Sequence, residues 1–433
     1  MQHPFEKLAE FAPVFRMLEA MKIPLVLLDP NVIRFNDTDP ILGAPNIVTF
    51  GVFENDSQKF QDFNQWRDLR PKWWLTEAVG TDYRRLHPKE EKAVYTSVVT
   101  HYFFVSTSSI VHIAVIFNRN NFFWVAGIRD SLLASRYRFL TNMTYAIPLP
   151  MAVDAFDCDK VPFLIYPAYN VCMPANLEYY LWQVPQARFH ECHYDDIVYP
   201  FKRQHKMQEA DTDPQREALA EVVKISKELR IPLMIIFGTL LGWYRQCDYI
   251  VESLDMDTAM MDYEYKPELF DRVFKSQVLT MYRRLGTLDL GLEFRTHTKR
   301  WVWLDIFLMY PRTHNNSFTY MLNQKYWMKS TYPIKKGVCS AELLGLLVYL
   351  PCNYEDYIHM EYGTDGWFAP VGGHPHRNMK MENYYEDPEI VYLEHIYENF
   401  TCSNPNEMWG CDPEPLTVVN STLYQNATRL KKG

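Results

Sequence analysis

The chain has 433 residues, a formal net charge of −9 and an apolar fraction of 48%. This length exceeds one ordinary hydrophobic core and predicts two domains of about 150 to 200 residues each. The apolar fraction excludes a globally disordered chain. An acidic chain without a basic stripe argues against a nucleic-acid partner held through its phosphates.

The first half of the chain predicts mixed α/β structure. Residues 5–21 carry apolar side chains at helical spacing, and IPLVLLDP at 23–30 predicts a short buried strand ending at Asp-Pro. The apolar runs HIAVIF and FFWVAG are separated by NRNN at 118–121. This pattern predicts a hairpin with a four-residue loop.

A polar stretch at 201–215 separates the two halves and predicts a domain boundary. Asp213 and Pro214 form an N-cap and first-turn proline pair, and the apolar residues after them recur with a helical period. A buried strand, IPLMIIF, then ends at a turn at Gly238. Two further strands are predicted, DMDTAMM at 255–261 and RWVWLDIFLMY at 300–310.

Three aspartates in these strands are the candidate catalytic and metal-binding residues. Asp255 and Asp257 lie two residues apart, so a strand directs both carboxylates to the same side. Asp305 lies among large apolar residues, where a lone charge is costly unless it is compensated. Oxygen ligands of this kind suit Mg²⁺ or Mn²⁺, which bind carboxylates and substrate phosphates together.

Three residues before the aspartate pair are candidates for substrate binding. Gly238 and Thr239 stand where a strand turns into a helix, and N–H groups at a helix start can hold a phosphate. Arg245 follows in the next turn and offers a charged planar fork for phosphate oxygens. Together with the aspartates, these residues predict metal-dependent transfer at a phosphorus centre.

Other polar clusters are open to simpler interpretations. An Asp-x-Asp pair alone is a weak motif, and Arg245 without it would be interpreted as a surface ion-pair partner. HECH at 190–193 and HPH at 374–376 match no common zinc spacing. Cys192, Cys247 and Cys352 sit in apolar contexts typical of small core residues, whereas Cys402 and Cys411 are close enough to be linked.

The location of the protein is indicated by glycosylation sequons. No apolar run reaches the roughly 18 residues of a membrane span, and the N-terminus lacks the apolar region of a signal peptide. Asn-x-Ser/Thr sequons nevertheless occur at residues 36, 55, 142, 315, 399, 420 and 426. We therefore expect a glycosylated lumenal protein whose anchoring segment is absent from this chain.

Several motifs together resemble the fukutin branch of the LicD/fukutin-related family. These are GTLLGWYRQCDYI…DMD at 238–257, LDIFLMY at 304–310 and YLPCNYEDYIHMEYG at 349–363. In the first half, IPLVLLDP and VPQARFHEC are similar to the N-terminal domain of that branch. The resemblance covers roughly residues 23–385. The family often has a glycine soon after its second aspartate, where this chain has Thr258 and Ala259.

The resemblance implies a polymerase-β-like nucleotidyltransferase catalytic domain of α/β class, preceded by a mixed α/β domain. The expected divisions are 1–205, 206–395 and a polar tail at 396–433. It further implies transfer of a polyol phosphate, such as ribitol 5-phosphate, from a CDP-linked donor to a protein O-mannosyl glycan of the α-dystroglycan type. The expected location is the Golgi or ER lumen, as a single-pass type II membrane protein.

The resemblance implies Asp255, Asp257 and Asp305 as the acidic triad, with Gly238, Thr239 and Arg245 near the donor phosphates and Asp305 assisting deprotonation. The expected partners are the donor, the glycan, other glycosyltransferases and a second copy of the chain. Two alternatives remain open. One is a GT-A-like glycosyltransferase that uses the Asp-x-Asp pair, and the other is a non-catalytic accessory subunit of a glycosylation complex. A third aspartate on an adjoining strand would favour the nucleotidyltransferase fold.

Overall fold

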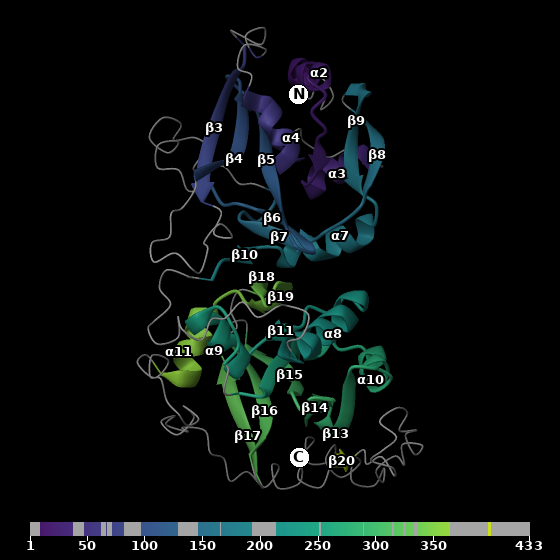
Figure 1. Cartoon of the computed structure of the whole chain (residues 1–433), viewed down its shortest axis with the longest axis vertical. Helices are drawn as coiled ribbons and strands as arrows, with labels where there is room; N and C mark the ends of the chain where they lie inside the picture. Colours follow the sequence, from purple (N-terminus) through teal and green to yellow (C-terminus); the bar gives the residue numbers. More distant parts are fainter. Residues whose placement is uncertain are drawn as a thin grey trace. The chain divides into compact units, whose positions relative to one another are not determined.

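The structure is a computed structural model, and its chain divides into two compact units (Figure 1). It describes residues 9–37, 47–61, 66, 72–81, 97–128, 146–164, 166–192, 214–250, 253–288, 290–313, 316–323, 326–332, 337–363 and 397–399. The first unit contains residues 1–191 and 339–347, and the second contains 192–338 and 348–433. Asp213, His193, the histidines at 374–376, Cys402, Cys411 and the tail after residue 399 lie outside the described residues.

The first unit is built around a mixed sheet. Its strands run in the order β3-β4-β5-β2-β1-β9-β8, and β6 and β7 continue from β5. Its strands are β1 (Val26–Leu27), β2 (Ile47–Phe53), β3 (Trp74–Thr81), β4 (Ser97–Val105), β5 (Ile110–Arg119), β6 (Phe122–Val125), β7 (Met151–Asp154), β8 (Cys158–Phe163), β9 (Tyr166–Pro174) and β10 (Phe189–His190). Its helices are η1 (Ala9–Phe11), α2 (Ala12–Ala20), α3 (Pro30–Asp37), α4 (Glu54–Ser57), η2 (Gln58–Gln61), α7 (Leu177–Gln183) and η5 (Val184–Gln186).

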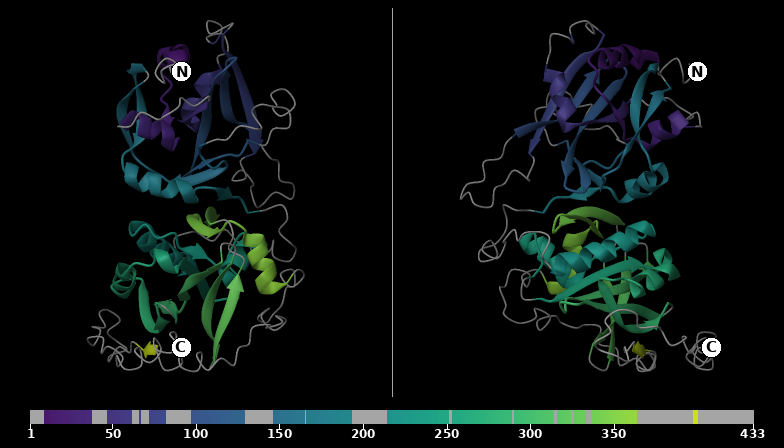
Figure 2. Two further views of the ribbon diagram at one scale, coloured as in Figure 1. Left: turned by 180° about the vertical axis from the view of Figure 1, so that it is seen from behind. Right: turned by 45° about the vertical axis from the view of Figure 1, so that its right-hand side comes forward.

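The core of the first unit follows from its apolar strands. Strand β5 is buried from Ile110 to Phe117 and pairs in parallel with β2, as expected of a strand covered on both faces. Helix α2 lies alongside β9 (Figures 1 and 2), and its Phe15 ring forms a mutually contacting cluster with the rings of Phe50 and Phe163. Burial of these large rings supplies much of the apolar area that stabilises the unit.

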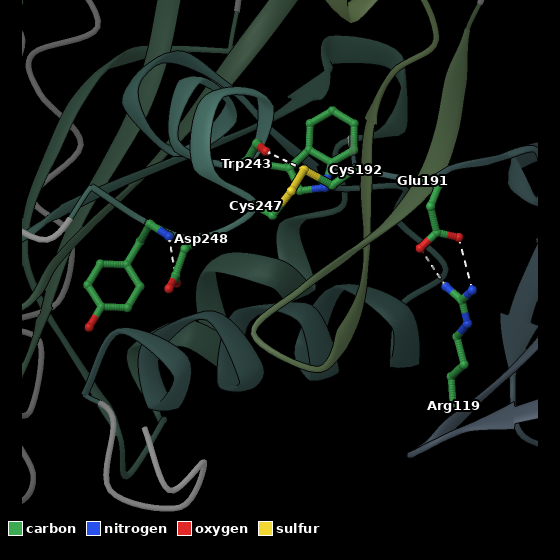
Figure 3. Close-up of a disulfide and its surroundings, with 7 residues drawn as sticks. Arg119, Glu191, Cys192, Trp243, Cys247 and Asp248 are labelled. Atoms are coloured by element: carbon green, nitrogen blue, oxygen red, sulfur yellow. Dashed lines mark hydrogen bonds and ion pairs between the residues drawn. A yellow bond between two sulfur atoms is a disulfide. The ribbon is translucent and has the colours of Figure 1, made fainter. Parts of the chain in front are cut away.

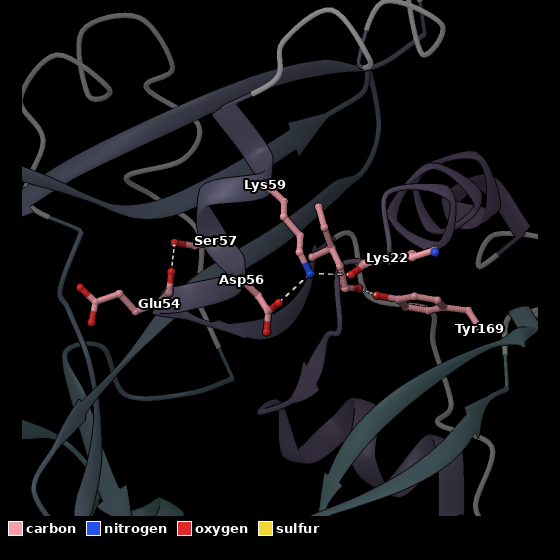
Figure 4. A network of polar contacts seen from close by, with 7 residues as sticks. Lys22, Glu54, Asp56, Ser57, Lys59 and Tyr169 are labelled. Atoms are coloured by element: carbon pink, nitrogen blue, oxygen red, sulfur yellow. Dashed lines mark hydrogen bonds and ion pairs between the residues drawn. The ribbon is translucent and has the colours of Figure 1, made fainter.

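Local polar contacts join the start of this unit to helix α4 (Figure 4). The ammonium of Lys59 donates to the carboxylate of Asp56 at 2.7 Å and to the carbonyl of Lys22 at 2.9 Å. The hydroxyl of Tyr169 donates to the carbonyl of Ile23. These contacts fix the chain that leads from α2 into β1.

The predicted hairpin between β5 and β6 is present, but its loop is shorter than expected. Arg119 pairs directly with Phe122, so only two residues form the turn. Asn120 adopts a positive φ of 57°, which asparagine tolerates better than most residues. The predicted four-residue loop is therefore wrong, because Asn118 and Arg119 continue the strand pairing.

The second unit is a mixed sheet with helices on both of its faces. Its main strands run in the order β19-β11-β12-β15-β14-β13-β20, and the β16–β17 hairpin continues from β15. The strands of this unit are β11 (Met234–Ile235), β12 (Asp255–Met261), β13 (Leu279–Thr287), β14 (Leu290–Thr298), β15 (Trp303–Thr313), β16 (Asn316–Asn323), β17 (Tyr326–Tyr332), most of β19 (Leu346–Pro351) and β20 (Tyr397–Asn399). Strand β18 (Val338–Leu343) belongs almost entirely to the first unit, with the first two residues of β19. The helices are α8 (Pro214–Glu228), α9 (Phe237–Gln246), η8 (Asp262–Glu264), α10 (Pro267–Phe274) and α11 (Tyr354–Tyr362).

The helices of the second unit leave one part of the sheet accessible. Helices α8 and α10 lie side by side (Figures 1 and 2), and the Phe270 ring of α10 packs 5.6 Å from that of Phe294 on β14. Phe294 points away from the face that carries its neighbours Glu293 and Arg295. On that other face, the Phe237 ring of α9 packs 5.4 Å from Phe307 on β15. We call this second side the front face, and the candidate site lies on it.

The predicted elements around this site are present in the structure. The helix after Pro214 runs to Glu228 and buries Leu219, Val222 and Val223 as its period predicted. The predicted strand at 255–261 is β12, with Met256 buried on the back face. The mixed α/β fold class is thus confirmed.

Candidate active site

The front face of the second unit brings the three predicted aspartates together. Strands β12 and β15 pair in parallel, with Asp257 directly opposite Asp305. Asp255 lies two residues before Asp257 and therefore points to the same face. One carboxylate oxygen from each of the three lies within 4.8 Å of the others. We call Asp255, Asp257 and Asp305 the acidic triad.

The triad spans a gradient of burial. Asp305 is 9% exposed, Asp257 is half-buried, and Asp255 is exposed. Asp255 is exposed because it is the first residue of β12, whereas the strand is buried from Thr258 onward. This gradient leaves one carboxylate accessible to a ligand while the other two are held in place.

The turn from β11 into α9 holds Asp257. The N–H of Asp257 donates to the Thr239 hydroxyl at 2.7 Å, and the N–H of Ile236 donates to the Asp257 carbonyl at 3.1 Å. The Gly238 N–H also hydrogen-bonds to the carboxylate of Asp257. Phe237, at the start of the helix, has a positive φ of 44°, an unusual conformation for a bulky residue. The helix start is thus built around one carboxylate.

These contacts refine the prediction made for Gly238, Thr239 and Arg245. Gly238 and Thr239 touch the triad directly, and Thr239 is only 2% exposed. Arg245 lies in the last turn of α9, not in a turn after it, and is buried. It lies seven positions after Gly238, a rise of about 10 Å along the helix axis.

Helix α9 ends at a disulfide that the sequence did not predict (Figure 3). Cys247 caps the helix with a positive φ of 56° and is bonded to Cys192. The Sγ atom of Cys192 also lies 3.0 Å from the carbonyl of Trp243. Cys352 is disulfide-bonded too, so the interpretation of these three cysteines as simple core residues is wrong. Their apolar surroundings were real, but partners distant in sequence lie beside them.

Two residues on strand β14 belong to the site although sequence reasoning missed them. Arg295 pairs with Asp305 across the sheet, and its Nε lies 3.7 Å from the Asp305 carboxylate. The same Nε donates to the carboxylate of Glu293, which is buried. The alternation of Glu293 and Arg295 along one strand was a signal for a shared face, but their neighbour could not be inferred from it.

The electrostatics of the triad disfavour full ionisation without a cation. Burial raises the pKa of Asp257 well above its ordinary value, the charge of Asp255 raises it further, and the Gly238 N–H lowers it. Burial also raises the pKa of Asp305, as do the charges of Glu293 and Asp255, while Arg295 lowers it. Four carboxylates thus gather at this site, and the guanidinium of Arg295 contacts those of Glu293 and Asp305. An added divalent cation would offset the remaining negative charge.

The donor set of the triad fits a hard cation. All three residues offer carboxylate oxygens, which Mg²⁺ and Mn²⁺ prefer, and no sulfur or imidazole ligand is among them. Carboxylates from two adjacent parallel strands, with a helix start beside one of them, can hold an ion against phosphate oxygens. The arrangement can therefore support transfer of a phosphorus-containing group.

The sequence of this unit matches a known domain. Residues 230–353 match the model described as LicD/FKTN/FKRP, nucleotidyltransferase domain. The match contains the entire acidic triad and all of helix α9.

The chain is similar to fukutins over most of its length. It is 28% identical over 379 residues to the mouse protein named ribitol-5-phosphate transferase FKTN, covering 82% of this chain and 80% of the relative. The proteins of the same name from Macaca fascicularis and human are 24% and 23% identical over 373 residues, covering 81% of this chain and 78% of each relative.

The chain is a relative of fukutin. The family resemblance predicted from its motifs is confirmed, and the similarity includes the first unit as well as the LicD domain. The nucleotidyltransferase domain and the names of the relatives both support the predicted enzyme class, a phosphotransferase. Within the part of the chain that the structure describes, no helix is both long and apolar enough to span a membrane.

Proposed function

We propose that the second unit transfers a polyol phosphate from a CDP-linked donor to a hydroxyl of a protein O-linked glycan. The observation that carries this proposal is the convergence of Asp255, Asp257 and Asp305 inside a LicD-type nucleotidyltransferase domain. Ribitol 5-phosphate is the transferred group named in the fukutin relatives. The position of Asp305 on the strand beside the Asp-x-Asp pair favours this fold over a GT-A-like glycosyltransferase.

The proposed reaction exchanges one phosphorus–oxygen bond for another. A glycan hydroxyl forms a bond to the polyol-bearing phosphorus, the phosphoanhydride bond breaks, and CMP leaves with the bonding electron pair. Asp255, Asp257 and Asp305 would hold Mg²⁺ or Mn²⁺, which when bound neutralises charge on the phosphates. Asp305 is the proposed acceptor of the hydroxyl proton, because burial favours its protonated form.

The residues around helix α9 have supporting roles in this proposal. Gly238 and Thr239 hold Asp257 and lie at a helix start, where the positive end of the helix dipole favours donor phosphates. Arg245 is proposed to add positive charge from the buried side of the same helix. The other proposed partners are glycosyltransferases of the same glycan and a second copy of this chain.

We also propose that the protein works in the Golgi or ER lumen, as a type II membrane protein. Disulfides Cys158–Cys172 and Cys192–Cys247 fit an oxidising compartment. Asn55, one of the sequon asparagines, is exposed. Protein made in eukaryotic cells with its natural N-terminus should carry N-glycans. An unchanged gel mobility after N-glycosidase treatment would count against this location.

The reaction is tested by measuring CMP release from CDP-ribitol in the presence of an O-mannosylated glycoprotein and Mg²⁺ or Mn²⁺. Asp257→Asn and Asp305→Asn should each reduce the rate on the order of a hundredfold or more, the usual cost of losing a preorganised charge-stabilising group. Their combination should be little worse than either alone, since parts of one unit are not additive. Asp271→Asn on the exposed side of α10 is the matched control and should leave the rate unchanged.

Two outcomes would contradict the proposal. Wild-type rates in both triad variants would mean that the acidic triad is not the catalytic centre. Absence of CMP release by the wild-type protein with any CDP-linked donor, together with binding to other glycosyltransferases, would favour the accessory-subunit alternative.

A further inference from the structure

A group of aromatic side chains, one of them exposed and two half-buried, borders the acidic triad on the front face. Asp255 pairs with Trp303 on β15, and Trp303 pairs with His297 on β14. These three residues form one row across the sheet, next to the row formed by Asp257, Asp305 and Arg295. The ring of Trp301 stacks on that of His297 at 4.9 Å and 13°. We call His297, Trp301 and Trp303 the aromatic rim.

In the aromatic rim, the rings of His297 and Trp303 support the ring of Trp301, which faces solvent. The Trp303 ring meets the His297 ring edge-on at 5.2 Å, and Trp301 lies 6.1 Å from Trp303. Trp301 is nevertheless 61% exposed, so a tryptophan ring is presented to solvent on a support of two other rings. Tryptophan rings offer a large apolar contact area and are enriched at interfaces.

The backbone at Trp301 is held in an unusual conformation. Its φ is 61°, in the left-handed region that bulky residues rarely adopt. The N–H of Trp301 donates to the Thr298 carbonyl at 3.0 Å, and the Thr298 N–H donates to the Val302 carbonyl at 2.9 Å. The N–H of Trp303 donates to the Leu254 carbonyl at 2.7 Å, which ties the turn to the start of β12. Such strain persists where the surrounding structure enforces it, and it often accompanies function.

We propose that the aromatic rim binds the apolar face of a sugar ring in the acceptor glycan. This inference rests on the proposed transferase function. A pyranose presents a face of C–H groups that packs on an aromatic ring, while its hydroxyls stay directed outward. A sugar on Trp301 would place its neighbouring hydroxyls toward Asp255, one row from Asp257 and Asp305.

The position of the rim favours the acceptor over the nucleotide. On one side of the triad lies the row of Ala259, Phe307 and Glu293. The start of helix α9 covers this row at Phe307, and the donor phosphates are proposed to lie at that helix start. The rim occupies the row on the opposite side. In-line displacement at phosphorus requires the attacking hydroxyl and the leaving group on opposite sides. The attacking sugar therefore belongs on the rim.

The test compares Trp301→Ala, Trp301→Tyr and the wild-type protein in steady-state kinetics with CDP-ribitol and an O-mannosylated glycoprotein. Trp301→Ala should raise the KM for the glycoprotein about tenfold, a typical cost of removing an aromatic anchor. The KM for CDP-ribitol and the slow CMP release to water should stay unchanged. Trp301→Tyr should recover most of the loss. Trp74→Ala is the matched control, because Trp74 is 46% exposed on β3 of the first unit.

Two kinetic results would overturn the proposal. An increase confined to the KM for CDP-ribitol would place the nucleotide base on the rim. Unchanged kinetics in Trp301→Ala would mean that the rim binds neither substrate.

A binding measurement separates failure of this inference from failure of the proposed function. Oligosaccharides released from an O-mannosylated glycoprotein are titrated into the wild-type protein and Trp301→Ala while tryptophan fluorescence is recorded. Saturable binding that only the wild type shows would support the rim even if no CMP release is found. Equal binding by both proteins, or binding by neither, would overturn the rim assignment while CMP release is judged on its own.

Discussion

The two units differ in how their buried charges are compensated. In the first unit, the guanidinium of Arg119 is 1% exposed and makes a bidentate ion pair with Glu191, at 2.9 and 3.0 Å (Figure 3). Glu342 lies 3.6 Å away, and the guanidinium stacks 4.0 Å from the centre of the Trp124 ring. Here opposite charges and an aromatic face compensate the cost of burial.

The second unit gathers charges of the same sign. Asp255, Asp257 and Asp305 converge, and Arg295 lies within ion-pair distance of both Asp305 and the buried Glu293. Stability alone would not select such an arrangement, because like charges in a buried site repel. The difference shows which unit is arranged for chemistry, since perturbed carboxylates in an accessible site are typical of functional centres.

Buried neutral groups extend the comparison. In the first unit, His112 lies 3.1 Å from the Thr49 hydroxyl and 3.0 Å from His101, all fully buried. Burial lowers the pKa of His101 to about 4 and that of His112 well below its usual value. In the second unit, burial raises the pKa of Glu361 to about 7, and the nearby Tyr332 side chain opposes the shift. The two units should therefore respond to pH with opposite signs.

The largest expected effect is the loss of the compensated cation in the first unit. Arg119→Met removes the charge and leaves Glu191 and Glu342 without it, which should destabilise the unit by about 3 to 5 kcal/mol. Lys59→Met, at the exposed ion pair with Asp56, is the control and should cost less than about 1 kcal/mol. Urea unfolding followed by circular dichroism measures both. Equal losses would mean that burial does not distinguish the two pairs.

The next effect is acid sensitivity of the first unit. The histidines have lowered pKa values in the folded state, so the unfolded chain takes up their protons first. The contribution of each histidine to stability should fall by up to about 1.4 kcal/mol for each pH unit below 6.5, toward pH 4. Asp29, whose burial raises its pKa to about 6, opposes this trend below pH 6. The free energy of unfolding of His101→Gln should change less steeply with pH than that of the wild type between pH 6 and 6.5. An equally steep change would mean that His101 is not its source.

Glu361 should make the stability of the second unit change with pH in the opposite direction, so that stability falls as the pH rises. Its raised pKa means that the folded state keeps a proton that the unfolded chain has released. Its contribution to stability is therefore present below pH 4.5 and is lost as the pH rises to about 7. Glu361→Gln should reduce this slope in metal-free protein, by up to about 1.4 kcal/mol for each pH unit. Thermal unfolding from pH 4.5 to 7.5 checks it, and an unaltered slope would mean that Glu361 is ionised throughout.

The smallest expected effect is a gain in stability of the metal-free protein when Asp257 is neutralised, as expected of a residue that serves ligand binding. Asp257→Asn removes one of several like charges. The free energy of unfolding of the metal-free variant, measured with urea, should therefore equal that of the wild type or exceed it by up to about 1 kcal/mol. The wild-type protein should be stabilised by added Mg²⁺ or Mn²⁺, and the variant much less, because binding to the folded state alone shifts the equilibrium. Destabilisation of the metal-free variant, with unchanged stabilisation by the ion, would assign Asp257 a purely structural role.

Local features of the sequence were sufficient to determine several parts of this site. The spacing of Asp255 and Asp257 implied a shared face because side chains alternate along any strand. Gly238 marked the turn from strand to helix, and the helical period after Pro214 gave α8. These features depend on residues a few positions apart, so a linear pattern contains them.

Only the tertiary structure decided which neighbours these residues have. The alternation of side chains along β14 and β15 does not predict that Arg295 pairs with Asp305, or that Trp303 pairs with Asp255. These pairs depend on which strands are neighbours and on the register between them. The bond between Cys192 and Cys247 likewise closes a separation of 55 residues. The pairing of Asp255 with Trp303 and the Cys192–Cys247 bond join segments that are distant in the sequence, and the free energy of packing the whole chain selects them.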